Sequence, residues 1–119
     1  MHEVLSMPGV MGWIVCAGSC FVIPEPAGLI VCRHAADEAE VLTVGVAPAR
    51  RKDGIGRALL EKAIDTLRSM RIRRLFLEVS ELNSVAISLY KKTGFSEIGR
   101  RSRYYDNKTD ALVLLYEIF

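Results

Sequence analysis

A basic loop that contains two glycines offers this chain its clearest chemistry. The segment runs from Val46 to Leu60 and reads VAPARRKDGIGRALL. An apolar strand enters the loop and an amphipathic helix leaves it, so backbone N–H groups and the positive end of the helix dipole converge on one point. Gly54 and Gly56 carry no Cβ, which lets the backbone close around an anion. The segment therefore predicts a binding site for a phosphorylated ligand.

The sequence does not have the residues that two common phosphate-binding motifs require at fixed spacings. A dinucleotide-binding fold requires a third glycine three residues after the second, where this chain has Leu59. A nucleotide-triphosphate loop requires Gly-Lys followed by Ser or Thr, and the sequence contains no such tripeptide. The pattern that remains is Arg51-x-x-Gly54-x-Gly56 after a Val-x-Pro turn.

Glu78 is a carboxylate inside an otherwise apolar strand predicted at residues 75–79. Such a strand is covered on both faces when it lies in a parallel pair, and a carboxylate there is costly unless it has a partner or a function. The functional interpretation is a general base. The structural alternative is an ion pair with a basic residue near the start of the strand, namely Arg71, Arg73 or Arg74.

Tyr90 lies in a helix predicted at residues 84–93, one turn beyond Ala86 and one turn before Gly94. Its phenol could donate a proton to the sulfur that leaves a thioester. The alternative is an ordinary core tyrosine whose hydroxyl is satisfied by a hydrogen bond. Helical periodicity alone favours the alternative.

The first half of the chain is predicted to be mainly strands. We expect the end of a helix at residues 1–7, a strand or tight hairpin at 11–23, a turn at 24–26, and strands at 28–34 and 40–46. Gly45, inside the last of these strands, indicates a bulge or the close approach of another backbone.

The second half is predicted to carry the helices. Residues 55–70 form an amphipathic helix, and it joins the strands at 40–46 and 75–79 as a parallel pair through a right-handed crossover. The helix at 84–93 is capped by Asn83 or Ser84 and ends before Gly94. Strands at 97–105 and 111–118 close the chain as an antiparallel pair around a turn at 106–108.

Length and composition restrict the class of protein. The 119 residues are predicted to form a single domain, 1–119, and half of them are hydrophobic. No apolar stretch is long enough to span a membrane and no secretion signal is visible, so we expect a soluble cytoplasmic protein. The net charge of +2 does not indicate a nucleic-acid partner. Cys16, Cys20 and Cys32 are interpreted as reduced thiols in strands, with no metal site.

The loop and a second motif together resemble the GNAT superfamily of acetyl-coenzyme A-dependent N-acetyltransferases. The second motif is Leu77-Glu78-Val79 followed at residues 83–95 by NSVAISLYKKTGF. The downstream stretches RRSRYY, at 100–105, and DAL, at 110–112, are similar to the RimI-like branch, the ribosomal-protein alanine N-acetyltransferases. The resemblance covers the chain from Glu40 to its end. It implies an α/β (α+β) fold, with a mixed, mostly antiparallel sheet and a central parallel βαβ unit splayed at a bulge.

The resemblance also implies a role for each matching residue. Glu78 would be the proton acceptor and Tyr90 the proton donor in a direct transfer from acetyl-coenzyme A, with no metal. Val44 and Val46 would pair with the pantetheine arm through their backbone, and Asn83 would contact the coenzyme near its thioester. The pyrophosphate loop and the start of the covered helix would comprise Arg51, Lys52, Asp53, Gly54, Ile55, Gly56, Arg57 and Ala58.

The acceptor implied by the resemblance is a primary amine, first of all the N-terminal α-amine of a protein. Family members carry a first strand and one or two helices before the matched region, whereas this chain has only residues 1–19 there. We therefore expect an N-terminally shortened domain whose unpaired sheet edge forms a homodimer. Acetylation of a small-molecule amine and a non-catalytic module that binds coenzyme A remain as alternatives. A cluster of basic residues is interpreted as a solvated face, which makes nucleic-acid binding unlikely; its members are Arg71, Arg73, Arg74, Lys91, Lys92, Arg100, Arg101 and Arg103.

Overall fold

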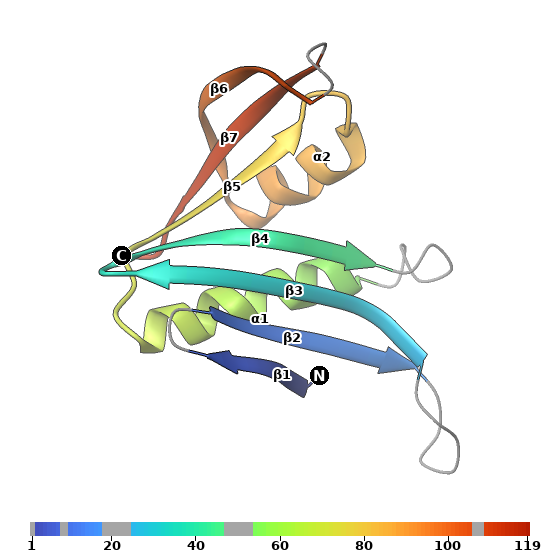
Figure 1. Ribbon diagram of the computed structural model, residues 1–119, viewed down its shortest axis with the longest axis vertical. Helices are drawn as coiled ribbons and strands as arrows, with labels where there is room; N and C mark the ends of the chain where they lie inside the picture. Colours follow the sequence, from blue (N-terminus) through green and yellow to red (C-terminus); the bar gives the residue numbers. More distant parts are fainter. Residues whose placement is uncertain (1, 8–9, 18–24, 47–53, 106–108) are drawn as a thin grey trace.

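The computed structural model describes residues 2–7, 10–17, 25–46, 54–105 and 109–119, and these form two helices and one seven-stranded sheet (Figure 1). The strand order is β1-β2-β3-β4-β5-β7-β6. The elements are β1 (His2–Met7), β2 (Val10–Ala17), β3 (Glu25–Ala35), β4 (Glu38–Val46), α1 (Ile55–Ser69), β5 (Arg74–Ser80), α2 (Ser84–Thr93), β6 (Ser96–Tyr105) and β7 (Thr109–Glu117). The predicted mixed sheet, with a single parallel pair at its centre, is confirmed.

The sheet divides into two arms because its central pair is short. β4 and β5 run parallel but pair only at Glu38–Arg74, Ala39–Leu75 and Glu40–Phe76. Beyond these positions the two strands diverge, and Figure 1 shows β4 and β5 close together near the C-terminus and far apart at their other ends. Each strand keeps an antiparallel neighbour on its other side, β3 for β4 and β7 for β5. The fold therefore leaves an opening between the two central strands.

A bulge in β4 lies where the strands begin to part. Val31 pairs with Thr43 and Cys32 pairs with Val41, so Leu42 is the extra residue. Gly45 pairs regularly with Leu29, and the prediction of a bulge at Gly45 is therefore wrong. The bulge falls at Leu42 because it depends on the register with β3 rather than on a glycine.

The close approach expected near Gly45 involves its neighbour Gly28 in β3. A Cβ at Gly28 would lie 2.7 Å from the Ile55 side chain and 3.2 Å from the carbonyl oxygen of Gly45. A Cβ at Gly45 would meet no described atom within 4 Å. The first turn of α1 thus rests directly on β3, which fixes the start of the helix relative to the sheet.

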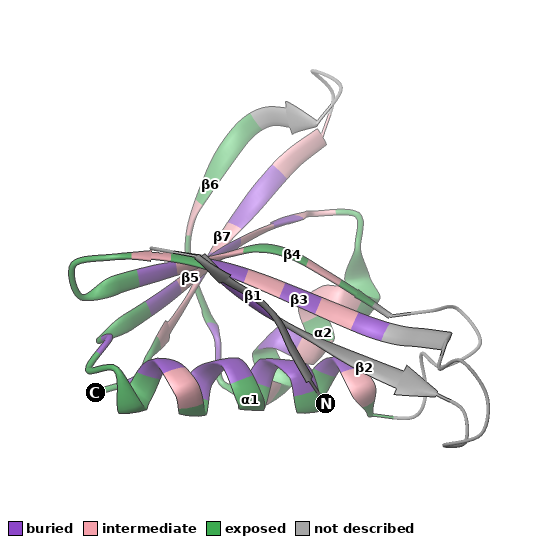
Figure 2. Cartoon of the chain, turned by 60° about the horizontal axis from the view of Figure 1, so that its bottom comes forward, coloured by how far each residue is buried: buried purple, intermediate pink, exposed green. Residues whose placement is uncertain are grey.

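The hydrophobic core lies between the sheet and α1. The buried face of this helix consists of Leu59, Leu60, Ala63, Ile64 and Leu67 together with Gly56. It contacts β2, β3 and β4 (Figure 2). Side chains of β5 alternate, with Leu75, Leu77 and Val79 buried and the residues between them half-buried. Glu78 therefore lies on the face of the sheet opposite the core.

Two predictions for the first 26 residues are wrong. Residues 2–7 form strand β1, which pairs with β2 as Glu3–Trp13 and Met7–Val10, and not the end of a helix. Six residues are too few for a helical period to be distinguished from strand alternation, so pairing with β2 decides the conformation. The predicted turn at 24–26 is replaced by strand from Glu25 onward. The predicted turn at 106–108 and residues 18–24, at the end of the predicted strand or hairpin, lie outside the described residues.

Cys32 is fully buried in the core of β3. Desolvation by burial raises the pKa of its thiol from 9.0 to about 12. The thiol therefore stays protonated at neutral pH, which makes it a packing group rather than a nucleophile.

Among the described residues no cluster of His, Cys, Asp and Glu could hold a metal ion, and neither helix has the length and apolar character that a membrane span requires.

Helix α1 ends in a Schellman motif with an arginine at the position that usually holds glycine. The N–H of Ile72 donates to the carbonyl of Leu67 at 3.0 Å, and the N–H of Arg71 donates to that of Arg68 at 3.1 Å. Arg71 adopts a φ of 65°, in the left-handed region that disfavours residues with a Cβ. Some backbone strain is therefore stored at this helix end.

We expect Arg71→Gly to stabilise the protein by about 0.5–1 kcal/mol, since relief of the left-handed conformation outweighs the added flexibility of the unfolded chain. Thermal unfolding followed by circular dichroism should show Tm rising by roughly 2–4 °C. Arg68→Gly, one turn earlier with ordinary helical geometry, is the matched control and should lower Tm. A similar loss of Tm in both variants would contradict this prediction.

Candidate functional site

The opening between β4 and β5 contains a cavity of about 320 Å³. Its wall includes residues around the β4 bulge, the second half of β5, the N-cap of α2 and one residue from the second half of that helix, namely Val41, Leu42, Thr43, Val44, Leu77, Glu78, Val79, Ser80, Asn83 and Tyr90. Glu78 and Tyr90, predicted from sequence as base and acid, thus line the same cavity although they come from different elements. The space between the splayed strands brings them together.

A second cavity, of about 710 Å³, adjoins the first and extends toward the start of α1. It is lined by Val44, Gly45, Gly54, Gly56, Arg57, Asn83, Val85, Ala86, Leu89 and Tyr90. Val44, Asn83 and Tyr90 line both cavities, so the two lie side by side. The larger cavity therefore connects the N-terminus of α1 with the pair Glu78 and Tyr90.

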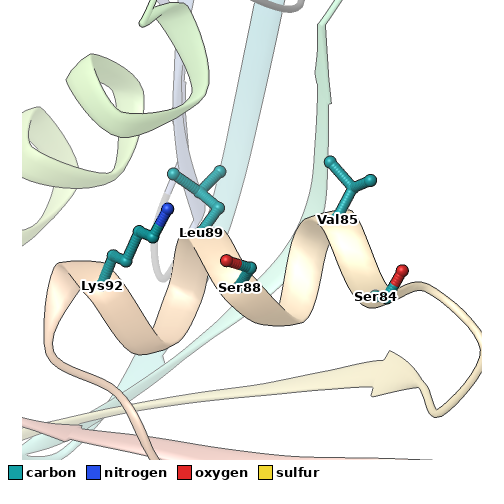
Figure 3. A pocket seen from close by; sticks show the side chains of 5 residues that line it. All are labelled: Ser84, Val85, Ser88, Leu89 and Lys92. Atoms are coloured by element: carbon teal, nitrogen blue, oxygen red, sulfur yellow. The ribbon is translucent and has the colours of Figure 1, made fainter.

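A shallow hollow of about 440 Å³ prolongs this site along α2 (Figure 3). It is lined by Ser84, Val85, Ser88, Leu89 and Lys92, and it shares Val85 and Leu89 with the larger cavity. Figure 3 shows Val85, Leu89 and Lys92 projecting from the same side of the helix. The outer end of this surface thus combines apolar side chains with one cation.

Gly54 and Gly56 begin α1 at the edge of the larger cavity. Gly54 is the N-cap, with a φ of 74°, and its carbonyl accepts the N–H of Ala58 at 3.1 Å. Gly56 is buried and lines the cavity, so the first N–H groups of the helix lie beside this space. Arg57 also lines the cavity, and its Nε donates to Glu61 at 2.9 Å.

The other predicted loop residues are distributed differently. Ile55 packs against the core, and Ala58 is exposed without lining either cavity. Val46 pairs with Gly28 through the ladder of β3 and β4. Arg51, Lys52 and Asp53 lie outside the described residues. The structure therefore places Val44, Gly54, Gly56, Arg57 and Asn83 at the cavity and does not bring Ile55 and Ala58 to it.

Asn83 has a structural role that the sequence also predicted. Its side-chain oxygen accepts the backbone N–H of Ala86 at 3.2 Å and so caps α2. Its own N–H donates to the carbonyl of Ser80 at 3.0 Å. These bonds fix the turn from β5 into α2, and with it the spacing between Glu78 and Tyr90.

Tyr90 is both a core residue and a cavity residue. It is buried, and its ring meets that of Phe95 edge-on with centroids 5.9 Å apart. Its carbonyl accepts the N–H of Phe95 at 3.0 Å, which closes the C-terminus of α2 around Gly94. The core interpretation and the functional one are therefore compatible, because the packed ring borders both cavities.

Glu78 forms an ion pair with a residue that the sequence analysis did not consider as its partner. Oε1 of Glu78 lies 3.1 Å from Nη2 of Arg101, which belongs to β6. Arg74, one of the three expected partners, lies instead 3.8 Å from Glu38, and within the described part of the chain no ion pair links Arg71 or Arg73 to Glu78. A partner two strands away was not predictable, since it depends on the register of β5, β7 and β6.

The cavity walls include further residues that the motifs did not indicate. Thr43 and Ser80 bring hydroxyl groups to the smaller cavity, while Val85 and Leu89 form the apolar wall of the larger one. The spacing of Val85 and Leu89, one helical turn apart, was the available signal.

Comparison with known proteins places these observations in a family. A model of the acetyltransferase (GNAT) family matches residues 7–95. The ribosomal protein bS18-alanine N-acetyltransferase of Escherichia coli strain K12 is 37% identical over 95 residues, which cover 77% of this chain and 64% of that relative. This chain thus spans less than two thirds of the length of that curated relative.

Two solved structures are also similar to this chain. The crystal structure of the ribosomal-protein-S18-alanine N-acetyltransferase from Escherichia coli superposes with a TM-score of 0.74 at 36% identity, covering 79% of this chain and 63% of that one. A NatC complex bound to Gag peptide and CoA matches with a TM-score of 0.82 at 29% identity, covering 89% of this chain and 70% of that one.

Proposed function

This chain belongs to the GNAT family of acetyltransferases, and on that premise we propose that it transfers the acetyl group of acetyl-coenzyme A to a primary amine, the N-terminal α-amine of a protein. One observation carries the proposal. Glu78 and Tyr90 line one cavity between splayed strands, and a larger cavity that adjoins it reaches the N-terminus of α1.

In this proposal the larger cavity holds the coenzyme. Gly54, Gly56 and Arg57 lie where N–H groups and the helix dipole favour an anion, which suits the pyrophosphate. The apolar wall formed by Val85 and Leu89 suits the pantetheine arm. The thioester then lies near Asn83 and Tyr90, at the junction of the two cavities.

The reaction follows from the groups at this junction. The amine nitrogen attacks the thioester carbonyl carbon while Glu78 accepts the proton that the nitrogen loses. The C–S bond then breaks, and the phenol of Tyr90 protonates the departing sulfur, giving the acetylated amine and coenzyme A. An α-amine has a pKa of about 7.7–8.0, so part of it is neutral before it binds. Holding both substrates in one opening supplies further rate by orientation.

Two of the similar proteins support a peptide as the acceptor. The Escherichia coli relative is named for the alanine of a ribosomal protein, and the NatC complex was solved with a peptide and CoA.

The bulge at Leu42 leaves an extra residue in β4 at the wall of the smaller cavity. Its backbone is a candidate donor to the oxyanion of the tetrahedral intermediate.

The test is an acetylation assay with a peptide that begins with alanine and contains no lysine. We expect release of the coenzyme A thiol together with a mass increase of one acetyl group at the N-terminus. The same peptide with a blocked N-terminus is the control and should not react. Acetylation of polyamines or amino sugars in place of the peptide would overturn the peptide proposal in favour of a small-molecule enzyme. Binding of acetyl-coenzyme A without turnover of any amine would support a non-catalytic module.

A further inference from the structure

The ion pair between Glu78 and Arg101 crosses the face of the sheet that lies opposite the core. Glu78 pairs with Val113 of β7, which pairs with Gly99 of β6. Arg101 lies two residues beyond Gly99 and opposite Ala111, so its side chain is on the same face as Glu78. Gly99 and Ala111 offer little bulk along this path. The long side chain of Arg101 therefore reaches over β7 to the carboxylate.

Arg100, the neighbour of Arg101 on the other face of the sheet, anchors the backbone from which the Arg101 side chain extends. Nη1 of Arg100 donates to Oε2 of Glu81 at 2.7 Å and lies 3.6 Å from Oδ2 of Asp110. The hydrogen bond to Glu81 raises the pKa of the Arg100 guanidinium above its ordinary value. The backbone N–H of Glu81 also donates to the carbonyl of Asp110 at 3.0 Å. The β6–β7 hairpin is thus held to the end of β5 at the point where Arg101 begins.

We propose that Arg101 is a specificity-determining residue that disfavours acceptors arriving as ammonium ions and so favours an α-amine over a lysine side chain. The inference rests on the proposed function, since it assumes that Glu78 accepts the proton of the amine. The guanidinium lies 3.1 Å from the carboxylate that the amine must approach. A cationic acceptor at Glu78 therefore experiences direct repulsion from Arg101, whereas a neutral amine does not.

The two classes of amine differ in how much of this repulsion they meet. A lysine side chain has a pKa of about 10.4, against about 7.7–8.0 for an α-amine, so at about pH 9 nearly all of the lysine is cationic while most of the α-amine is neutral. We take roughly 7 Å between the guanidinium of Arg101 and the nitrogen of the acceptor, and an effective dielectric constant of about 40–80. One guanidinium then weakens the binding of a cation by roughly three- to sevenfold. At about pH 9 this penalty therefore applies almost fully to the lysine and hardly at all to the α-amine.

The exposure of the Arg101 side chain predicts a second measurable effect, a dependence of the repulsion on salt concentration. Its side chain is 57% exposed, whereas that of Glu78 is 26% exposed. The repulsion therefore acts partly through solvent and should be screened by salt, because the Debye length falls from about 10 Å at 0.1 M to about 3 Å at 1 M. A role of Arg101 in folding alone would not depend on the charge of the acceptor in this way.

The experiment compares kcat/KM for two peptides, one with a free N-terminus and no lysine, the other with a blocked N-terminus and one lysine. Wild type, Arg101→Gln, Arg101→Lys and the control Arg68→Gln are assayed. Arg68 is an exposed α1 residue paired with Asp65 at 2.9 Å and lies outside both cavities. At about pH 9 we expect Arg101→Gln to raise the ratio of lysine to α-amine activity roughly three- to sevenfold, through KM of the lysine peptide. Arg101→Lys and Arg68→Gln should keep the wild-type ratio.

The salt dependence of the wild-type ratio tests the inference without requiring that any variant fold. The wild-type ratio should rise between about 0.05 M and 0.5 M KCl, because salt screens the repulsion between Arg101 and a cationic acceptor. An unchanged ratio in Arg101→Gln, or a wild-type ratio insensitive to salt, overturns the inference alone. If wild type acetylates neither peptide, the proposed function fails and the inference fails with it.

Discussion

Glu78→Gln is expected to lower kcat for acetyl transfer by roughly 10²–10⁴-fold, the usual contribution of a positioned general base. Glutamine preserves the volume of the side chain and one carbonyl oxygen near Arg101 but cannot accept the proton of the amine. Glu78 lines the smaller cavity and not the larger one. KM for acetyl-coenzyme A should therefore remain at the wild-type value, and steady-state kinetics with the alanine peptide measure both constants.

Glu40→Gln is the matched control for this prediction. Glu40 pairs with Phe76 across β4 and β5, so its side chain lies on the same face of the sheet as Glu78. It also forms an ion pair with an arginine, Arg33, as Glu78 does with Arg101. Neither cavity of the site includes it. Glu40→Gln should retain wild-type kcat, and retention of more than about a third of kcat by Glu78→Gln would rule out the base.

Gly56→Glu is expected to weaken acetyl-coenzyme A binding by at least about a hundredfold. Gly56 is buried in the first turn of α1 and lines the larger cavity, so a glutamate side chain would enter the space beside the first N–H groups of the helix. A carboxylate at this position also competes with the pyrophosphate for the positive end of the helix dipole. Steric and electrostatic effects therefore act in the same direction.

Calorimetric titration of acetyl-coenzyme A measures this effect directly. Wild type should bind about one molecule per chain, and Gly56→Glu should give no measurable heat. Lys62→Glu is a stringent control for charge, because it reverses a charge at an exposed position of the same helix that lines neither cavity. Circular dichroism must first show that both variants are folded. Wild-type affinity in a folded Gly56→Glu variant would mean that the coenzyme does not use the start of α1.

Local signals in the sequence determined the helices and most of the strands. The apolar spacing from Ile55 to Leu67 predicted α1, and α2 begins and ends as its cap at Asn83 and its terminator Gly94 indicated. These features depend on contacts within a few residues, so they can be read without the rest of the fold. β1 was predicted wrongly, because a short apolar segment takes its conformation from the strand with which it pairs.

The chemistry of the candidate site divides in the same way. The sequence alone predicted Gly54 and Gly56 as the opening of a helix from residue type and spacing, and it singled out Glu78 and Tyr90 as candidate base and acid through their resemblance to a family motif. Only the tertiary structure showed that Glu78 and Tyr90 share a cavity, because this requires β4 and β5 to part after three paired positions. The pairing of Glu78 with Arg101 likewise depends on the register of three strands, which a single sequence does not encode locally.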